Sequence, residues 1–420
     1  MDKKKLLQLI FFFLLISLIV FSSLYKINTG HGEIGISADT LGIGDRTFYI
    51  DDNDPFGDKG YSGEAGGYMG SPLYPKILEI ASFISIKIFG GNSTSTIWNV
   101  IVISFSALSA LATNKLLYLT GRVFGGYKVG NTCMLIYMIC PYTYYYVLVG
   151  GITNYTLLGC TALTYSVTKL WKEGKQKQLT AIKYELFLLL SSMLGLAYLR
   201  PDSSIFSFIA ALAILIKLLF NNKAEKQFKK NVTNTLYLIS TFIILISLHQ
   251  IYETFEYSIR VINKSLVYGG SYFGYPRELL REKINILTSS SDIRNIIKGY
   301  SFRFSFVVTD FLAGLNGIRD TFNATDHESI FSFLGRIFTG IFYLVPLSTF
   351  SVFSIIIFRD KIFKEGFIIP LLASFAAIAT SLFGCSLSKY YFMFISPFII
   401  MCSFYFEKSK AALDIEIEKY

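Results

Sequence analysis

Charged residues are scarce in this chain. They make up 16% of its 420 residues, against 52% hydrophobic residues, whereas soluble domains carry about 25% charged residues. The five cysteines have no paired spacing, which argues against a disulfide framework and a zinc site. The three histidines lack metal-ligand spacing, and the short basic segments contain no glycine-rich phosphate loop. These shortages exclude an ordinary soluble domain and argue against a nucleotide-binding inner face.

Long apolar runs are what the chain has in their place. Several approach the roughly 18–20 residues that cross a bilayer as a helix. The sequence therefore predicts an all-α integral membrane protein, a polytopic bundle of about ten transmembrane helices. The expected spans cover residues 6–24, 96–119, 129–147, 154–171, 184–199, 203–220, 235–252, 336–358, 367–384 and 390–406.

The basic residues set the expected orientation. The net charge is +10, but most lysines and arginines lie in short segments between apolar runs, which is typical of cytoplasmic loops rather than of nucleic-acid binding. Lys3, Lys4 and Lys5 precede the first run. We expect a multi-pass protein of the plasma (bacterial inner) membrane with both termini in the cytoplasm and membrane lipid around it.

Two amphipathic stretches are interpreted as helices lying on the outer face rather than as spans. Residues 72–90 are short and interrupted by charges, and residues 300–315 contain Arg303 and Asp310. The chain then divides into an N-terminal membrane module, 1–252, with its first outer loop at 25–95. An outer segment, 253–329, and C-terminal helices with a cytoplasmic tail, 330–420, follow.

The first outer loop carries the strongest functional signal. Residues 38–75 hold six aspartates and Glu64 directly after an apolar anchor. Charge placed against a membrane bundle is costly and marks a candidate site. The alternatives are a solvated acidic loop or a calcium loop at 51–58, which lacks the full EF-hand spacing. Tyrosines at 142 and 144–146 fit an aromatic belt at the outer interface.

Several motifs occur in a fixed order along the chain. They are GDRTFY at 44–49, SPLYPKILEIASFISIKIFG at 71–90, LLYLTGRVFG at 116–125, PYTYYY at 141–146, GGITNYTLLG at 150–159, LGLAYLRPDS at 194–203 and SKYYFMFISPF at 388–398. This series resembles the GT-C membrane glycosyltransferases, in particular bacterial relatives of protein O-mannosyltransferases and aminoarabinose transferases.

The resemblance implies a GT-C-like fold and a hexosyl- or pentosyltransferase, expected to be inverting. The donor would be a polyprenyl-phosphate sugar, and the acceptor a hydroxyl of a glycan, lipid or protein at the outer face. The family's base in a D-x-x-x-Y context matches Asp45, with Tyr49 four residues on. Arg200 matches the family's R-P-[E/D] turn, and Lys389-Tyr390 stands where the family often has Arg-Tyr.

The chain departs from the family at one position. Relatives commonly carry an acid within a T-[E/D] pair, where this sequence has Thr153-Asn154. An amide cannot act as a base, so the sequence gives no support for a second carboxylate. No metal-binding residue is assigned, no cofactor is certain, and a divalent metal stays open.

The chemistry of such a transfer assigns the candidate residues their roles. Asp45 takes the acceptor proton, and its negative neighbours Asp51 and Asp52 strengthen it as a base. The departing phosphate needs cations, which Arg200 and Lys389 would supply. Further substrate-binding candidates are Tyr49, Tyr390 and Arg303.

Two other functions remain open from the sequence. A polysaccharide polymerase or ligase of the O-antigen type also has many spans and a large late outer loop, which residues 253–329 could form. A flippase or transporter of lipid-linked sugars would show repeated halves and broken helices, and the sequence shows no such repeat.

Overall fold

A computed structural model describes residues 3–29, 83–89, 96–149, 152–173, 179–199, 291–299, 339–384 and 392–417. Isolated positions between 73 and 81 and between 203 and 241, and residue 301, are described as well. Throughout this described part the secondary structure is helical, with no strand. The all-α prediction is therefore confirmed for the part of the chain that the structure describes.

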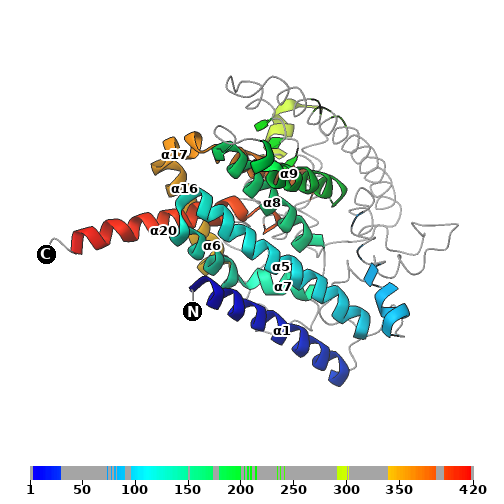
Figure 1. The fold of residues 1–420 in the computed structure, drawn as a ribbon. Helices are drawn as coiled ribbons and strands as arrows, with labels where there is room; N and C mark the ends of the chain where they lie inside the picture. Colours follow the sequence, from blue (N-terminus) through cyan, green and yellow to red (C-terminus); the bar gives the residue numbers. More distant parts are fainter. Residues whose placement is uncertain are drawn as a thin grey trace.

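Helix α5 (Thr96–Gly125) is the centre of the arrangement (Figure 1). It packs against α1 (Lys3–Thr29), α6 (Tyr127–Met138), α7 (Pro141–Val149) and α8 (Ile152–Glu173), and it also contacts the last helix. The other described helices are α9 (Leu179–Leu199), α16 (Val345–Ile357), α17 (Arg359–Lys364), α18 (Ile368–Gly384) and α20 (Ser396–Ile417). Two π-helical segments, η1 (Ile84–Ile88) and η2 (Thr339–Leu344), and a helical stretch at residues 293–299 are described as well.

Two groups of buried side chains form the core. One joins α8, α9 and α18 with Phe206 and Phe394. The other joins α1, α5, α6, α7, η2, α16 and α20. Small residues allow close helix contact: a Cβ on Gly121 would lie 2.7 Å from Cys133 Sγ, and one on Gly159 would lie 2.7 Å from Leu196 Cδ2. Such contacts drive helix association where the surroundings are apolar.

The observed helices follow most of the expected runs, with differences at breaks. Helices α8, α9 and α18 match the predicted segments closely. The prediction of one continuous helix over 129–147 is wrong, because the chain breaks between α6 and α7. Pro141, at the start of α7, has no N–H to continue the ladder of α6. The last helix begins at Ser396 rather than at residue 390, and α17 is helical where a loop was expected.

Only part of the apolar sequence passes a strict length test among the described residues. Val100–Gly125 is long and apolar enough to cross a bilayer by itself. Shorter apolar helices are Lys5–Val20, Tyr184–Leu199, Phe342–Ile357 and Ile368–Ile378. Breaks shorten some of the helices, and serine and threonine lower the hydropathy of α8. The polytopic arrangement therefore stays a prediction.

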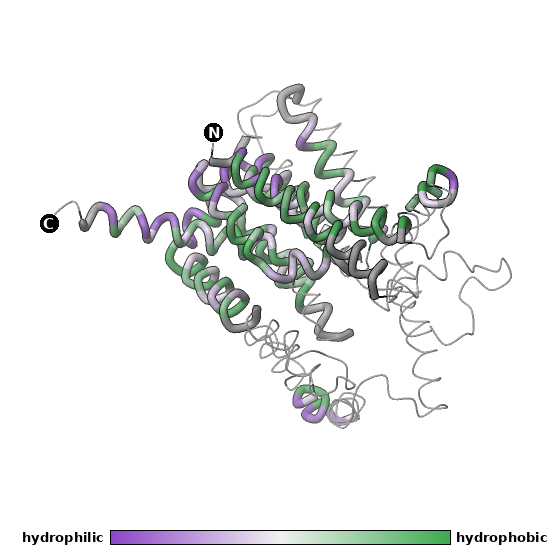
Figure 2. The backbone as a smooth tube through the Cα atoms, turned by 90° about the horizontal axis from the view of Figure 1, so that it is seen from below, coloured by the Kyte–Doolittle hydropathy of each residue, from purple (hydrophilic) through white to green (hydrophobic). Residues whose placement is uncertain are grey.

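Three segments predicted to be cytoplasmic meet beside α20 at one end of the bundle, which we call the basic end. Lys172 Nζ donates to the Val123 carbonyl at 2.8 Å, and Trp171 Nε1 donates to the Lys364 carbonyl at 3.3 Å. Lys361 Nζ lies 4.4 Å from the ring centroid of Phe404. Figure 1 shows the N-terminus, α17 and the distal part of α20 at this same end, opposite the segment around η1. Figure 2 shows α20 leaving the bundle and becoming more hydrophilic toward the C-terminus.

Candidate functional site

The predicted site residues lie outside the described residues. This applies to Asp45, Tyr49, Asp51, Asp52, Arg200, Arg303, Lys389 and Tyr390. Described neighbours flank two of the motifs: Leu199 ends α9 just before Arg200, and Phe392 follows Tyr390 closely. The candidate site consists of the described residues that adjoin these motifs.

A buried polar relay joins three helices at the end opposite the basic end. Asn154, in the first turn of α8, donates from Nδ2 to Ser106 Oγ at 2.9 Å. Ser106, on α5, donates in turn to the Tyr146 carbonyl of α7 at 3.3 Å. Asn154 is 1% exposed, and its Oδ1 has no hydrogen-bond partner among the described residues. A buried acceptor without a partner is costly, which marks this position as a candidate for ligand or water contact.

The relay shows how Asn154 is held in this chain. The neutral amide of Asn154 donates to Ser106 Oγ, which a carboxylate in its place could not do. Within the described part of the chain, no group of His, Cys, Asp and Glu has metal-binding geometry. Asn154 can orient a hydroxyl or a water there, but it cannot take a proton.

An aromatic cluster of Tyr142, Tyr146 and Phe392 encloses the same region. The rings of Tyr146 and Phe392 stack with centroids 5.1 Å apart, and Tyr142 meets Phe392 edge-on at 6.1 Å. Tyr142 and Tyr146 are buried inside the bundle, and their place at the membrane interface stays a prediction. Tyr146 belongs both to the relay, through its carbonyl, and to the cluster, through its ring.

At the break between α6 and α7, side-chain hydroxyl groups donate hydrogen bonds to the backbone carbonyls that end α6. Three successive carbonyls at the end of α6 accept hydrogen bonds, from Tyr343 OH to Ile136, from Thr143 Oγ1 to Tyr137 and from Tyr144 OH to Met138. The distances are 3.0, 3.0 and 2.6 Å. Irregular backbone inside an apolar bundle persists only when its polar groups find such partners. Tyr343 itself comes from the π-helical segment η2, a type of segment that is frequent at functional sites.

A second break lies beside the first. The turn at residues 392–395 interrupts the helix before Ser396, and the hydroxyls of Thr161 and Ser396 pair at 2.5 Å. Phe392, in this turn, packs on Tyr142 and Tyr146 of α7. Two interrupted helices therefore face each other next to the polar relay.

Removing the Tyr343 hydroxyl is expected to destabilise the fold at the break between α6 and α7. Tyr343→Phe leaves the Ile136 carbonyl without this partner, at a cost of about 1–3 kcal/mol in the free energy of unfolding. Thermal unfolding of the detergent-purified protein measures the change. Tyr127→Phe is the control, because the Tyr127 side chain is exposed. Equal melting temperatures for the two variants would contradict the capping role.

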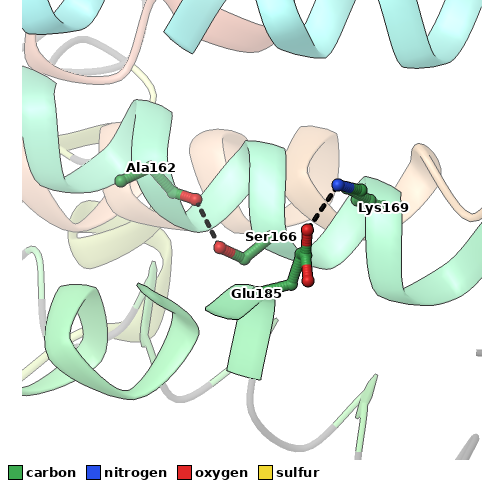
Figure 3. A network of polar contacts seen from close by, with 4 residues as sticks. All are labelled: Ala162, Ser166, Lys169 and Glu185. Atoms are coloured by element: carbon green, nitrogen blue, oxygen red, sulfur yellow. Dashed lines mark hydrogen bonds and ion pairs between the residues drawn. The ribbon is translucent and has the colours of Figure 1, made fainter. Parts of the chain in front are cut away.

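An ion pair between α8 and α9 was missed by sequence reasoning (Figure 3). Lys169 Nζ donates to Glu185 Oε1. The Glu185 side chain is 10% exposed and that of Lys169 is 22% exposed. Ser166 lies one turn away on α8, and its hydroxyl donates to the Ala162 carbonyl of the same helix at 2.9 Å. Both charges lie within expected spans, and the short connection between those spans was the signal that could have predicted the pair.

Removing only one partner of the Lys169–Glu185 ion pair is expected to lower the stability of the protein. Glu185→Ala leaves Lys169 partly buried without its carboxylate, which should reduce stability by about 2 kcal/mol after allowance for the partial exposure of Lys169. The double variant Lys169→Met/Glu185→Leu should recover most of that loss, because apolar replacement of a buried pair is often neutral. Unfolding midpoints of wild type, single and double variants test this; a double variant no better than the single one would contradict it.

Comparison with known proteins adds no family. No family model matches the chain, and no match was found among curated proteins or solved structures. The resemblance carried by the order of the motifs therefore stays a prediction.

Proposed function

We propose that this chain is a polytopic membrane glycosyltransferase. It transfers a sugar from a polyprenyl-phosphate donor to a hydroxyl of a glycan, lipid or protein at the outer face of the membrane. The observation that carries the proposal is the junction of Asn154, Ser106, Tyr146 and Phe392 at one end of the bundle. Tyr146, Asn154 and Phe392 belong to the motifs at 141–146, 150–159 and 388–398, and Ser106 of α5 links the first two through hydrogen bonds.

The arrangement of the basic end supports the proposed orientation. Segments assigned to the cytoplasm by their lysines and arginines contact one another through Lys172, Trp171 and Lys361. If one of the helices between these segments ran in the opposite direction, the segments would lie at opposite ends of the bundle. In that orientation the relay and the aromatic cluster lie toward the outer face.

Cysteine accessibility tests this orientation. Ser62→Cys places a thiol in the first outer loop, and Lys410→Cys places one on the exposed part of α20. A membrane-impermeant maleimide should label position 62 in intact cells and position 410 only after permeabilisation. Labelling of the wild-type protein measures the background from the five native cysteines. Labelling of position 410 in intact cells would contradict the orientation.

The proposed reaction needs a negatively charged base for the acceptor hydroxyl and positive charges for the departing phosphate. The Asp45 carboxylate takes the proton of the acceptor hydroxyl as its oxygen bonds to the anomeric carbon of the sugar. The bond from that carbon to the phosphate oxygen breaks, and its electron pair stays on the phosphate. Arg200 and Lys389 stabilise the negative charge of the polyprenyl phosphate. Inversion at the anomeric carbon follows from a single displacement.

Transfer from the lipid pool of membrane vesicles tests the function. Vesicles loaded with radiolabelled polyprenyl-phosphate sugar should pass label to a hydroxyl-bearing acceptor and accumulate free polyprenyl phosphate. Label in growing polysaccharide on a pyrophosphate-linked lipid would favour the polymerase instead. Label that crosses the bilayer while still attached to its lipid would favour the flippase.

The transporter is the second candidate, and one observation favours it. Discontinuous helices facing each other within a bundle are typical of transporter substrate sites. Here the break after α6 and the turn before α20 meet through Phe392 and the two tyrosines of α7. The sequence shows no repeated halves, so the transferase remains the first proposal.

A further inference from the structure

Three lysines from distant elements gather at the basic end. Lys361 Nζ of α17 lies 4.4 Å from the Phe404 ring centroid and 5.2 Å from that of Phe124. Lys408 Nζ of α20 lies 5.8 Å from the same Phe404 ring. Lys172, at the end of α8, completes the group.

The positive charge of this group exceeds its described negative charge. Lys172 Nζ is 3.4 Å from Glu365 Oε2, and it also donates to the Val123 carbonyl. Burial lowers the pKa of Lys361; Glu365 opposes this shift, and the neighbouring Lys408 and Lys172 add to it. Aromatic faces stabilise a cation only modestly at partly exposed positions. An anion placed between Lys361 and Lys408 would relieve their repulsion.

Exposed apolar side chains adjoin these cations. In α17, Ile362 is buried, while its neighbour Phe363 is 61% exposed. Ile356 and Ile357, at the end of α16, are exposed as well. The fold therefore presents lysines beside an apolar surface, which is the pattern that suits a lipid with a charged headgroup and acyl chains.

We propose that the basic end binds the phosphate headgroup of an anionic lipid, with Lys361 and Lys408 holding the phosphate. The exposed residues Phe363 and Ile357 would lie against the acyl chains. The assignment to the inner leaflet rests on the proposed membrane orientation. Headgroup binding itself needs neither that orientation nor any transfer activity.

Binding to the purified full-length protein tests the proposal. Native mass spectrometry in detergent would compare phosphatidylglycerol with phosphatidylcholine of the same acyl chains. We expect phosphatidylglycerol to bind at least about tenfold more tightly, since each lysine near an anionic headgroup contributes appreciably. Equal binding of the two lipids would overturn the proposal.

Matched variants locate the site. Lys361→Gln/Lys408→Gln should lose the preference for phosphatidylglycerol, whereas Lys5→Gln/Lys410→Gln removes the same charge from exposed positions and should keep it. If the first variant does not fold, Lys408→Gln alone should still weaken binding about threefold or more. An unchanged preference in the Lys408 variants would contradict the assignment.

Inorganic phosphate separates a lipid site from a free-anion site. Millimolar phosphate should compete weakly with phosphatidylglycerol, because it lacks acyl chains to contact Phe363. Complete competition at that concentration would overturn the lipid assignment. These binding results are independent of donor transfer, so failure of the glycosyltransferase proposal would leave them interpretable.

Discussion

Asp45→Asn is expected to lower sugar transfer by about 100-fold or more while the protein is produced normally. The amide keeps the shape of the carboxylate but cannot accept the acceptor proton. Asn154 offers no alternative base, because an amide side chain does not accept a proton as a carboxylate does. The effect should fall on turnover rather than on donor binding, because Asp45 acts on the acceptor hydroxyl. Radiolabel transfer in vesicles with matched protein amounts measures it.

Asp58→Asn is the matched control for this prediction. It removes the same charge from the same acidic loop but lies outside the motif that contains Asp45 and Tyr49. Transfer by this variant should stay within about twofold of wild type, because a solvated charge contributes little. Full activity of Asp45→Asn would remove Asp45 from the mechanism and direct attention to Asp51 and Asp52. Equal losses in both variants would point to the charge of the whole loop.

Gly366→Ala is expected to have the largest effect on stability. Gly366 has φ +72°, and a Cβ there would lie 2.2 Å from Cγ and Cδ2 of Trp171. The left-handed backbone costs an alanine roughly 1–2 kcal/mol, and displacement of a packed indole adds a comparable amount. We expect a loss of about 3 kcal/mol or more and a clear fall in melting temperature. The Trp171 hydrogen bond to the Lys364 carbonyl should break with it.

Gly195→Ala is the control for the glycine prediction. Gly195 lies within α9, and a Cβ there would meet no atom within 4 Å. Alanine has the higher helix propensity, so this variant should be neutral or slightly more stable. Thermal unfolding of both variants in the same detergent makes the comparison. A Gly366→Ala melting temperature equal to that of Gly195→Ala would contradict the packing of Trp171 on Gly366.

The apolar runs of the sequence predicted the helices that are continuous. Residues 154–171 and 184–199 were predicted as apolar spans, and α8 and α9 form there. Hydropathy did not predict the break after α6, because that break depends on hydroxyls from other places in the chain, such as Tyr343. A proline in an apolar run marks only a place where a helix can break.

The candidate site depends even more on distant pairings. The sequence places Asn154 within a motif, but only the fold shows that Ser106 of α5 accepts a hydrogen bond from it. The ion pair of Lys169 and Glu185 was missed because a span prediction tolerates single charges near its ends. The acidic loop was predicted from composition alone, and its residues lie outside the described part of the chain.

Sugar transfer by the purified wild-type protein is the decisive test of the proposed glycosyltransferase activity. The protein would be reconstituted in liposomes with a defined polyprenyl-phosphate sugar, and free polyprenyl phosphate would be measured together with glycosylated acceptor. We expect the two products to appear in equal amounts and only when donor and acceptor are both present. Failure to release polyprenyl phosphate from a panel of such donors, by protein that is folded and correctly oriented, would contradict it.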